Sequence, residues 1–242
     1  MPVGTGSTRV TYVTDVGDEV TADISRVDAR RIAEGIPVRD FPVYVGRRNY
    51  SGFFWSSTMR RHVVYESLLE LSWLWLADFD PRVLRIAAQP MVLRGHDVAR
   101  MRNRIPDFIS VMRDGTIRVI DVKPSAMLAK TEVKASLSWT GGVVRDRGWD
   151  YEVWTGPEPT MLRNVRWLSA ARPPHVSSTL DLPTTSRQVA DGCTFEVLER
   201  RLSAAGRPAP RMEILGALWQ GDLRCDLSQV LDSRTWLEPA VE

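Results

Sequence analysis

Three of the charged side chains in the stretch "IPDFISVMRDGTIRVIDVK", which covers residues 105–123, could act together chemically. They are Asp107, Asp121 and Lys123, and isoleucine, valine and phenylalanine fill most of the positions around them. Carboxylate oxygens are the ligands that hard cations such as Mg²⁺ prefer, and a nearby lysine can orient or deprotonate a water molecule. Such a set can cut a phosphodiester bond. Taken separately, two of these residues have structural explanations: Asp107 could cap a turn, and Lys123 could begin the loop before Pro124.

This chemistry requires the three side chains to share one face of a sheet. Side chains alternate faces along a strand, so Asp121 and Lys123 share a face in any case. Asp107 joins them only if the hairpin loop has an odd number of residues, because a two-residue turn would direct it to the other face. A three-residue loop made of a type I turn and a bulge favours glycine at its last position, and Gly115 ends the segment Arg113-Asp114-Gly115. We therefore predict the three-residue loop, with Asp107 directly opposite Asp121.

Two aspartates that face each other in an apolar sheet repel one another, and their burial is costly without a cation between them. This cost favours a metal site over a structural role. The order Pro106-Asp107, a gap of 13 residues, then Asp121-Val122-Lys123 resembles the pattern of the PD-(D/E)XK nucleases. The resemblance implies a metal-dependent nuclease with Mg²⁺ as its cofactor, for which Mn²⁺ can substitute.

Nucleases of this fold usually add a glutamate from the helix that precedes the sheet. Residues 62–79, "HVVYESLLELSWLWLADF", form the strongest predicted helix, and Glu66 and Glu70 would lie on one of its faces. Glu70 leads into an apolar run and is the first candidate, Glu66 is the second, and a solvated helix face is the alternative explanation for each. Gln89, before Pro90, could contact a metal-bound water or DNA, or cap the end of its strand. The predicted site has Glu70, Asp107, Asp121 and Lys123 as catalytic residues, the three acids as metal ligands, and Glu66 and Gln89 as accessory residues.

The pattern of predicted elements indicates an α/β fold, with a mixed sheet flanked by helices as in restriction endonucleases. A strand pair within 1–25 precedes a short helix over 26–35, and a second long helix is expected over about 127–147. The remaining predicted strands cover 83–89, 91–95, 105–112, 116–122 and 149–155. Near the C-terminus, two helices and a small hairpin favour a winged-helix-like module. The expected division is an N-terminal extension (1–43), a PD-(D/E)XK nuclease domain (44–172), a Pro/Ser-rich linker (173–182) and a winged-helix-like C-terminal domain (183–242).

Basic residues are distributed unevenly, although the net charge is only +2. Between Asp40 and Glu66 there is no acid, while four arginines stand among aromatic residues. Arginine interleaved with aromatic residues suits contact with phosphates and bases, so double-stranded DNA is the expected partner. A solvated face in an arginine-favouring genome is the alternative. The candidate DNA-binding residues are Arg47, Arg48, Arg60, Arg61 and, from a second basic run, Arg104.

Other features of the composition bear on location. The chain has 242 residues and no run of about 18 apolar ones, so no membrane span is expected. Its N-terminus lacks a basic stretch followed by an apolar one, which argues against a secretory signal. Cys193 and Cys225 match neither a zinc pattern nor a disulfide framework, so reduced thiols are expected. These observations predict a cytoplasmic protein, and DNA binding would place it at the bacterial nucleoid.

A longer set of motifs, from about residue 44 to 172, resembles the TnsA-type endonuclease subunits of heteromeric transposases. The set comprises Tyr65-Glu66-Ser67 through Glu70, Asp78-Phe79-Asp80-Pro81, Gln89-Pro90, Pro106-Asp107, Asp121-Val122-Lys123 and Asn164-Val165-Arg166-Trp167-Leu168. The resemblance implies that Glu70, Asp107, Asp121 and Lys123 form the active site of a Mg²⁺-dependent nuclease that nicks the 5′ ends of a mobile element. It also implies a DDE-type transposase that cuts and joins the 3′ ends, and an ATPase regulator, as partners.

Two other functions fit the same residues. The first is a restriction or repair nuclease of the same fold, in which the C-terminal module alone reads the DNA sequence. The second is a catalytically inactive DNA-binding protein built on a nuclease scaffold. The intact Asp107, Asp121 and Lys123 argue against this last interpretation.

Overall fold

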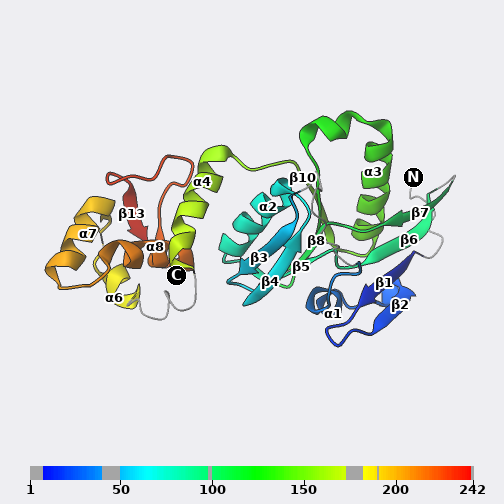
Figure 1. The fold of residues 1–242 in the computed structure, drawn as a ribbon, viewed down its shortest axis with the longest axis horizontal. Coiled ribbons are helices and arrows are strands. Elements are labelled where there is room, and N and C mark those ends of the chain that lie inside the picture. The colour runs from blue at the N-terminus through cyan, green and yellow to red at the C-terminus, as the bar shows by residue number, and fades with distance from the viewer. Residues whose placement is uncertain (1–7, 40–49, 98–99, 173–181, 190, 241–242) are drawn as a thin grey trace. The chain divides into compact units, whose positions relative to one another are not determined.

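The structure, a computed structural model, describes residues 8–39, 50–97, 100–172, 182–189 and 191–240. The chain divides into two compact units (Figure 1). The N-terminal unit comprises Met1–Ala77 with Arg82–Gly156, and the C-terminal unit comprises Asp78–Pro81 with Pro157–Glu242. Within the described residues, no helix is both long enough and apolar enough to cross a membrane.

A four-stranded mixed sheet forms the centre of the N-terminal unit, with the strand order β10-β9-β8-β5. Its strands are β5 (Val83–Ala88), β8 (Phe108–Met112), β9 (Ile117–Val122) and β10 (Asp150–Trp154). β10 runs parallel to β9, whereas β8 is antiparallel to both of its neighbours. The expected mixed α/β architecture is therefore present, and each of these strands lies where a β-branched run predicts one.

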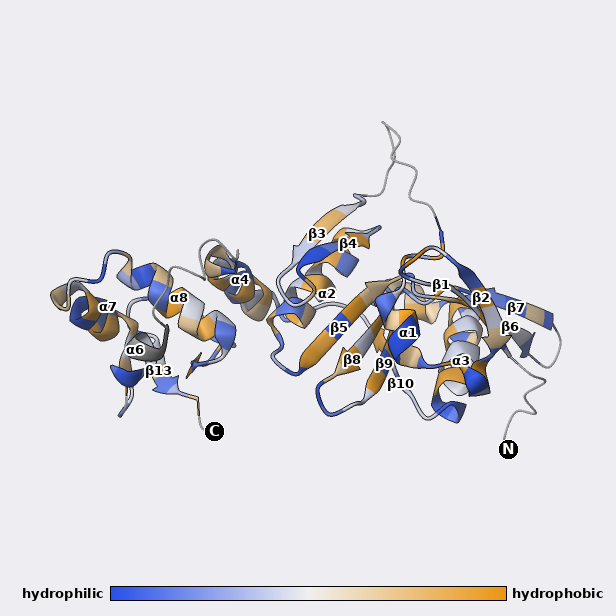
Figure 2. Ribbon diagram, turned by 90° about the horizontal axis from the view of Figure 1, so that it is seen from below, coloured by the Kyte–Doolittle hydropathy of each residue, from blue (hydrophilic) through white to orange (hydrophobic). Residues whose placement is uncertain are grey.

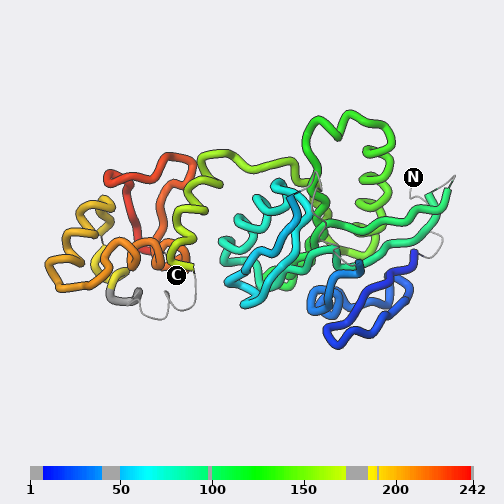
Figure 3. Tube along the Cα trace, in the orientation of Figure 1, coloured from blue at the N-terminus to red at the C-terminus, as the bar shows by residue number. Residues whose placement is uncertain are grey.

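A second four-stranded sheet has the order β2-β1-β6-β7. It contains β1 (Arg9–Val13), β2 (Glu19–Asp23), β6 (Val92–Asp97) and β7 (Arg100–Arg104). The strand pair predicted near the N-terminus is confirmed, because β1 and β2 pair in antiparallel fashion. β1 also pairs with β6 (Figure 3), so the described part of the 1–43 segment is built into the N-terminal unit rather than forming a separate extension.

Helices cover both faces of the central sheet, and each face has its own apolar core (Figure 2). On one face, α1 (Ala29–Glu34) and α3 (Thr131–Asp146) pack with the second sheet. On the other face lie α2 (Leu68–Phe79) and the hairpin of β3 (Gly52–Ser56) and β4 (Arg61–Tyr65). Short 3-10 turns occur at η1 (Ile24–Arg26) and η2 (Ser125–Ala129). Asp121 lies near the end of β9, and Asp107 immediately precedes β8.

The predicted helix over 62–79 is wrong in its first third. Residues up to Tyr65 belong to β4, and the helix begins only at Leu68. The β-branched and aromatic residues of β4 suit a strand, and Ser67 then marks the start of the helix. The hydroxyl of Ser67 accepts a hydrogen bond from the Glu70 N–H at 3.1 Å, and Glu70 Oε1 accepts one from Ser67 Oγ at 2.9 Å. This arrangement is a variant of the capping box that fixes helix N-termini.

The C-terminal unit combines helices with a small three-stranded sheet of order β11-β13-β12. Its elements are α4 (Pro159–Leu168), η3 (Ser169–Ala171), α6 (Leu182–Arg187), β11 (Cys193–Thr194), α7 (Phe195–Ala204), α8 (Pro210–Gln220), β12 (Leu223–Arg224) and β13 (Trp236–Pro239). The predicted terminal hairpin is confirmed as the antiparallel pair of β12 and β13. Both cysteines carry free thiols.

The boundary between the units differs from the expected one. Asn164 of α4 is buried and donates hydrogen bonds to the carbonyls of Leu227 and Gln229, at 2.9 and 2.6 Å. α4 also packs against α8. These contacts attach α4 to the C-terminal unit, so the division falls after Gly156 rather than in the predicted linker over 173–182. Most of that linker lies outside the described residues.

Candidate active site

The hairpin between β8 and β9 has the predicted three-residue loop. Phe108 pairs with Ile120, and the Met112 N–H donates to the Thr116 carbonyl at 2.8 Å. Residues 113–115 therefore form the loop, and Gly115 adopts φ +88°, a backbone conformation that favours glycine. This register places Asp107 and Asp121 opposite one another, immediately beyond the Phe108–Ile120 pair.

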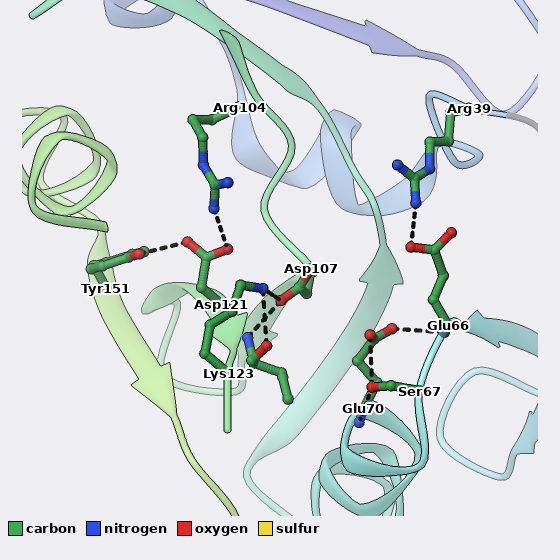
Figure 4. Close-up of polar contacts among 10 residues, drawn as sticks. Arg39, Glu66, Ser67, Glu70, Arg104, Asp107, Asp121, Lys123 and Tyr151 are labelled. Carbon is green, nitrogen blue, oxygen red and sulfur yellow. Dashed lines mark hydrogen bonds and ion pairs between the residues drawn. The ribbon is translucent and has the colours of Figure 1, made fainter. Parts of the chain in front are cut away.

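Asp107 and Lys123 form a close pair at the open end of this hairpin (Figure 4). Asp107 Oδ2 accepts hydrogen bonds from the Val122 N–H at 2.6 Å and from Lys123 Nζ at 2.8 Å. Lys123 Nζ also donates to the Val122 carbonyl at 2.9 Å. Within the described residues, Asp107 Oδ1 accepts no hydrogen bond, and the side chain is 19% exposed. Asp107 therefore retains one accessible carboxylate oxygen.

Asp121 is fully buried, and both of its oxygens are engaged. Oδ2 accepts a hydrogen bond from Tyr151 Oη at 2.5 Å, and Oδ1 lies 3.1 Å from Nη2 of Arg104 (Figure 4). Burial raises the pKa of Asp121 above its ordinary value, and the charge of Asp107 raises it further. Burial and the Asp121 charge also raise the pKa of Tyr151 far above its usual range, so Tyr151 donates as a neutral phenol.

Glu70 faces this group from the first turn of α2. Its Oε2 accepts a hydrogen bond from the Glu66 N–H at 2.8 Å. Burial raises the pKa of Glu70 above its ordinary value, and the negative charge of Asp107 adds to the effect. We call Glu70, Asp107, Asp121 and Lys123 the carboxylate site.

Glu66 does not lie on the helix, contrary to the prediction. It occupies the turn between β4 and α2, and its carboxylate forms an ion pair with Arg39 (Figure 4). β4 takes the place of the start of the predicted helix, so Glu66 precedes α2. The four-residue spacing to Glu70 therefore does not bring the two side chains to one helix face. Glu70 lies in the first turn of α2, whereas Glu66 pairs with Arg39.

Gln89 follows β5, the strand that flanks β8 on the side away from β9. It therefore lies beside Asp107, and Asp121 lies on the other side of Asp107. The Gln89 N–H donates to the Asp107 carbonyl at 2.8 Å, which continues the register of β5 and β8. Its backbone has φ +44°, which is uncommon for a non-glycine residue, and strained backbone of this kind clusters at functional sites. The side chain is 5% exposed, and its Oε1 has no hydrogen-bond partner in the described part of the chain. A buried polar atom of this kind favours a ligand or an ordered water as its partner.

The donor atoms of the carboxylate site suit a divalent cation. Three carboxylates contribute hard oxygens, and only Lys123 and Arg104 offset their charge by direct ion pairs among the described residues. The side chains do not converge, however: no group of three or more His, Cys, Asp or Glu in the described residues is arranged to hold a metal ion. Glu70 is turned back onto its helix cap, and Asp121 onto Arg104 and Tyr151. Cation binding would therefore require at least one of these carboxylates to change partners.

Of the candidate DNA-binding arginines, the structure describes Arg60, Arg61 and Arg104, and these lie on different elements. Arg47 and Arg48 lie outside the described residues. Arg60 is exposed in the turn between β3 and β4, and Arg61 begins β4 and donates to the Glu34 carbonyl at 3.4 Å. Arg104 instead ends β7 and contacts Asp121. Arg104 therefore belongs to the carboxylate site.

Tyr151 is a site residue that the sequence did not reveal. It lies on β10, where it pairs with Val119, two positions before the pair of Val153 with Asp121. Tyr151 and Asp121 thus share a face of the sheet. In the sequence, Tyr151 is only a tyrosine within the predicted strand over 149–155. Its contact with Asp121 depends on the register of the parallel pair β9 and β10, and about 30 residues of chain separate Asp121 from Tyr151.

In comparisons with known proteins, no family model and no curated protein matches this chain.

Proposed function

We propose that the protein is a metal-dependent DNA endonuclease of the PD-(D/E)XK type. The observation that carries this proposal is the hairpin register that places Asp107 opposite Asp121, with Lys123 Nζ 2.8 Å from Asp107. Glu70 contributes a third carboxylate from the first turn of α2. Nothing in the packing of an apolar sheet requires two aspartates here, and their burial is offset only by ion pairs with Lys123 and Arg104.

Each residue then has a defined task. Mg²⁺, or Mn²⁺ in its place, would be held by oxygens of Asp107, Asp121 and Glu70, and when bound it supplies positive charge at the scissile phosphate and lowers the pKa of the attacking water. Asp107 fixes the Lys123 ammonium group by their ion pair. The Lys123 ammonium group donates a hydrogen bond to the attacking water and so orients it. Tyr151 holds Asp121 in one orientation through its hydrogen bond.

The more specific proposal is a TnsA-like subunit of a heteromeric transposase, which nicks the 5′ ends of a transposon. Its support is the ordered set of motifs that resembles such subunits, from Glu70 through Asp107 and Asp121 to Asn164. The helices α7 and α8 with the small sheet of β11, β13 and β12 suit a winged-helix-like module that contacts DNA or a partner. A DDE-type transposase and an ATPase regulator are the proposed partners, and the bacterial cytoplasm, at the nucleoid, is the proposed location.

A nicking assay tests the enzyme proposal. Duplex DNA that carries the ends of the mobile element is incubated with Mg²⁺, with and without the proposed DDE-type partner. Wild type and Lys134→Gln, an exposed site on α3, should nick the 5′ ends, whereas Asp107→Asn and Asp121→Ala should not. Equal absence of cleavage in all four proteins, with DNA binding retained, would support an inactive binding protein instead.

The same assay separates transposition from restriction or repair. Cleavage at a fixed sequence in unrelated DNA, by the chain alone, would support a restriction or repair nuclease. A neighbouring reading frame for a methyltransferase would point the same way, and one for a DDE recombinase would support the transposase.

A further inference from the structure

Asp121 has two side-chain partners of different electrical character. Tyr151 is neutral and supplies a hydrogen bond, whereas Arg104 supplies a positive charge. Among the described residues, Arg104 is the only cationic group within hydrogen-bonding distance of Asp121. Because a buried carboxylate is strongly destabilising without a compensating charge, Arg104 is the counter-ion of Asp121 in this structure.

The contact between Arg104 and Asp121 uses little of the guanidinium group. In the Arg211–Glu199 pair, Nε lies 3.0 Å from Oε1 and Nη2 lies 3.1 Å from Oε2, so both edges of the fork are used. Arg104 contacts Asp121 through Nη2 alone. Its Nε is buried and has no hydrogen-bond partner in the described part of the chain. A buried N–H without an acceptor is costly, and it indicates that this guanidinium is arranged for a second anion.

We propose that Arg104 is an exchangeable counter-ion, which neutralises Asp121 when no divalent cation is bound and transfers to a DNA phosphate when the cation binds. This inference rests on the proposed nuclease function and concerns the regulation of the same site. Arg104 is then a positioning residue, which holds either Asp121 or the phosphate. Cation occupancy of the carboxylate site consequently depends on DNA.

Electrostatics drives the exchange. A divalent cation held by Asp107 and Asp121 repels the guanidinium that it displaces, and it also replaces the charge that Asp121 needs. The freed guanidinium requires a new anion, and phosphate matches its planar fork through two parallel hydrogen bonds, one of which uses the idle Nε. The Arg104 side chain is 25% exposed, so a phosphate can reach it from solvent.

The position of Arg104 in the chain couples the two events. Arg104 is the last residue of β7, and only Ile105 and Pro106 separate it from Asp107. A phosphate held by Arg104 therefore lies next to the carboxylates that bind the cation. By linkage, a cation that releases Arg104 strengthens DNA binding, and DNA strengthens cation binding by the same factor.

The first test measures cation binding without DNA. Ca²⁺ is titrated into wild type, Arg104→Gln, Arg104→Lys and a matched surface control, Arg94→Gln on β6, by calorimetry at pH 8. Arg104→Gln should bind Ca²⁺ about fivefold or more tightly than wild type, because a competing charge is gone. Arg104→Lys and Arg94→Gln should stay close to wild type. If Arg104→Gln binds Ca²⁺ no more tightly than wild type does, or more weakly, the proposed exchange is wrong.

The second test measures binding of a short duplex by fluorescence anisotropy, in EDTA and in Ca²⁺. Ca²⁺ should tighten DNA binding of wild type and Arg94→Gln by about fivefold or more, whereas both Arg104 variants should lose most of this stimulation. Arg104→Lys keeps the charge, so the test still holds if Arg104→Gln fails to fold. Equal stimulation in wild type and Arg104→Lys overturns the proposal.

Failure of the nuclease proposal has a different signature. If wild type binds no Ca²⁺, or if Asp107→Asn binds Ca²⁺ as tightly as wild type does, the proposed cation site is absent. Both proposals then fail together. If wild type binds Ca²⁺ through Asp107 but Arg104→Gln changes neither Ca²⁺ nor DNA binding, only the exchange fails.

Discussion

Lys123 donates a hydrogen bond to Asp107 across the open end of the β8–β9 hairpin, with Nζ 2.8 Å from Oδ2. The Val122 carbonyl accepts a second hydrogen bond from the same ammonium group. Lysine has three donors on one flexible stem, so two fixed acceptors hold the head group in place and leave one donor. In the proposed mechanism, that donor meets the attacking water.

The first prediction concerns Lys123. Lys123→Gln should lower the rate of nicking by about 100-fold or more, because the ammonium group that orients the attacking water is lost and misplacing a reacting group by about 1 Å costs about that much. The unfolding free energy should change by less than about 1 kcal/mol, because the ion pair with Asp107 is partly exposed. Rates on plasmid DNA and urea unfolding curves check the two parts. Loss of stability that matches the loss of rate would indicate a structural lysine instead.

The second prediction concerns the loop that sets the register. Gly115 has φ +88°, and a Cβ added there would meet no atom within 4 Å. Gly115→Ala should therefore lower the unfolding free energy by about 1–2 kcal/mol through backbone strain alone, while nicking at a permissive temperature is retained.

Gly142 offers the matched control for this substitution. It lies within α3, and a Cβ there would also meet no atom within 4 Å. Gly142→Ala should raise the unfolding free energy by up to about 1 kcal/mol, because alanine favours a helix interior. Urea unfolding of the two variants should give shifts of opposite sign, and a stabilising Gly115→Ala would contradict the left-handed loop.

The third prediction decides between the two glutamates. Glu70→Gln should abolish nicking, because Glu70 is the proposed third carboxylate ligand of the cation, whereas Glu66→Gln should retain most of the nicking activity, because Glu66 pairs with Arg39. Both substitutions keep the size of the side chain and remove one charge, so each is the control for the other. The reverse pattern in a nicking assay would return Glu66 to the site.

The sequence predicted the local geometry of the hairpin well. The loop length followed from the parity argument and from the glycine at position 115, both of which depend only on neighbouring residues. The same holds for the strand pair of β1 and β2 and for the end of α1 at Gly35. The start of α2 was wrong, because β4 and the helix share one apolar run, and only the Ser67 cap separates them.

Features that depend on distant parts of the chain were missed. β7 consists of Arg100-Met101-Arg102-Asn103-Arg104, which has little strand propensity by itself and forms through its pairing with β6. The partners of Asp121 come from β7 and β10, whose registers a single sequence does not specify. The boundary after Gly156 likewise depends on the contacts of Asn164 with a loop more than 60 residues away.

The final prediction concerns stability and pH in the absence of divalent cations. The pKa values of Asp121 and Glu70 lie above their ordinary values of 3.8 and 4.5, chiefly because of burial. The folded protein therefore keeps these protons to a higher pH than the unfolded chain does. Stability from the two groups is fully present below their ordinary pKa values, and it is lost as the pH rises through the folded values.

Unfolding free energies measured in EDTA between pH 4 and pH 8 should reveal this loss, at about 1.4 kcal/mol for each unit by which a pKa is raised. Asp121→Asn and Glu70→Gln remove the titrating groups, so each should gain stability relative to wild type as the pH rises across that window. Mg²⁺ should stabilise wild type more at pH 8 than at pH 5, because protons compete with the cation for the same oxygens. If the unfolding free energies of wild type and both variants changed in parallel with pH, burial would not raise the pKa values of the two carboxylates. The energetic reason for a cation at this site would then be lost.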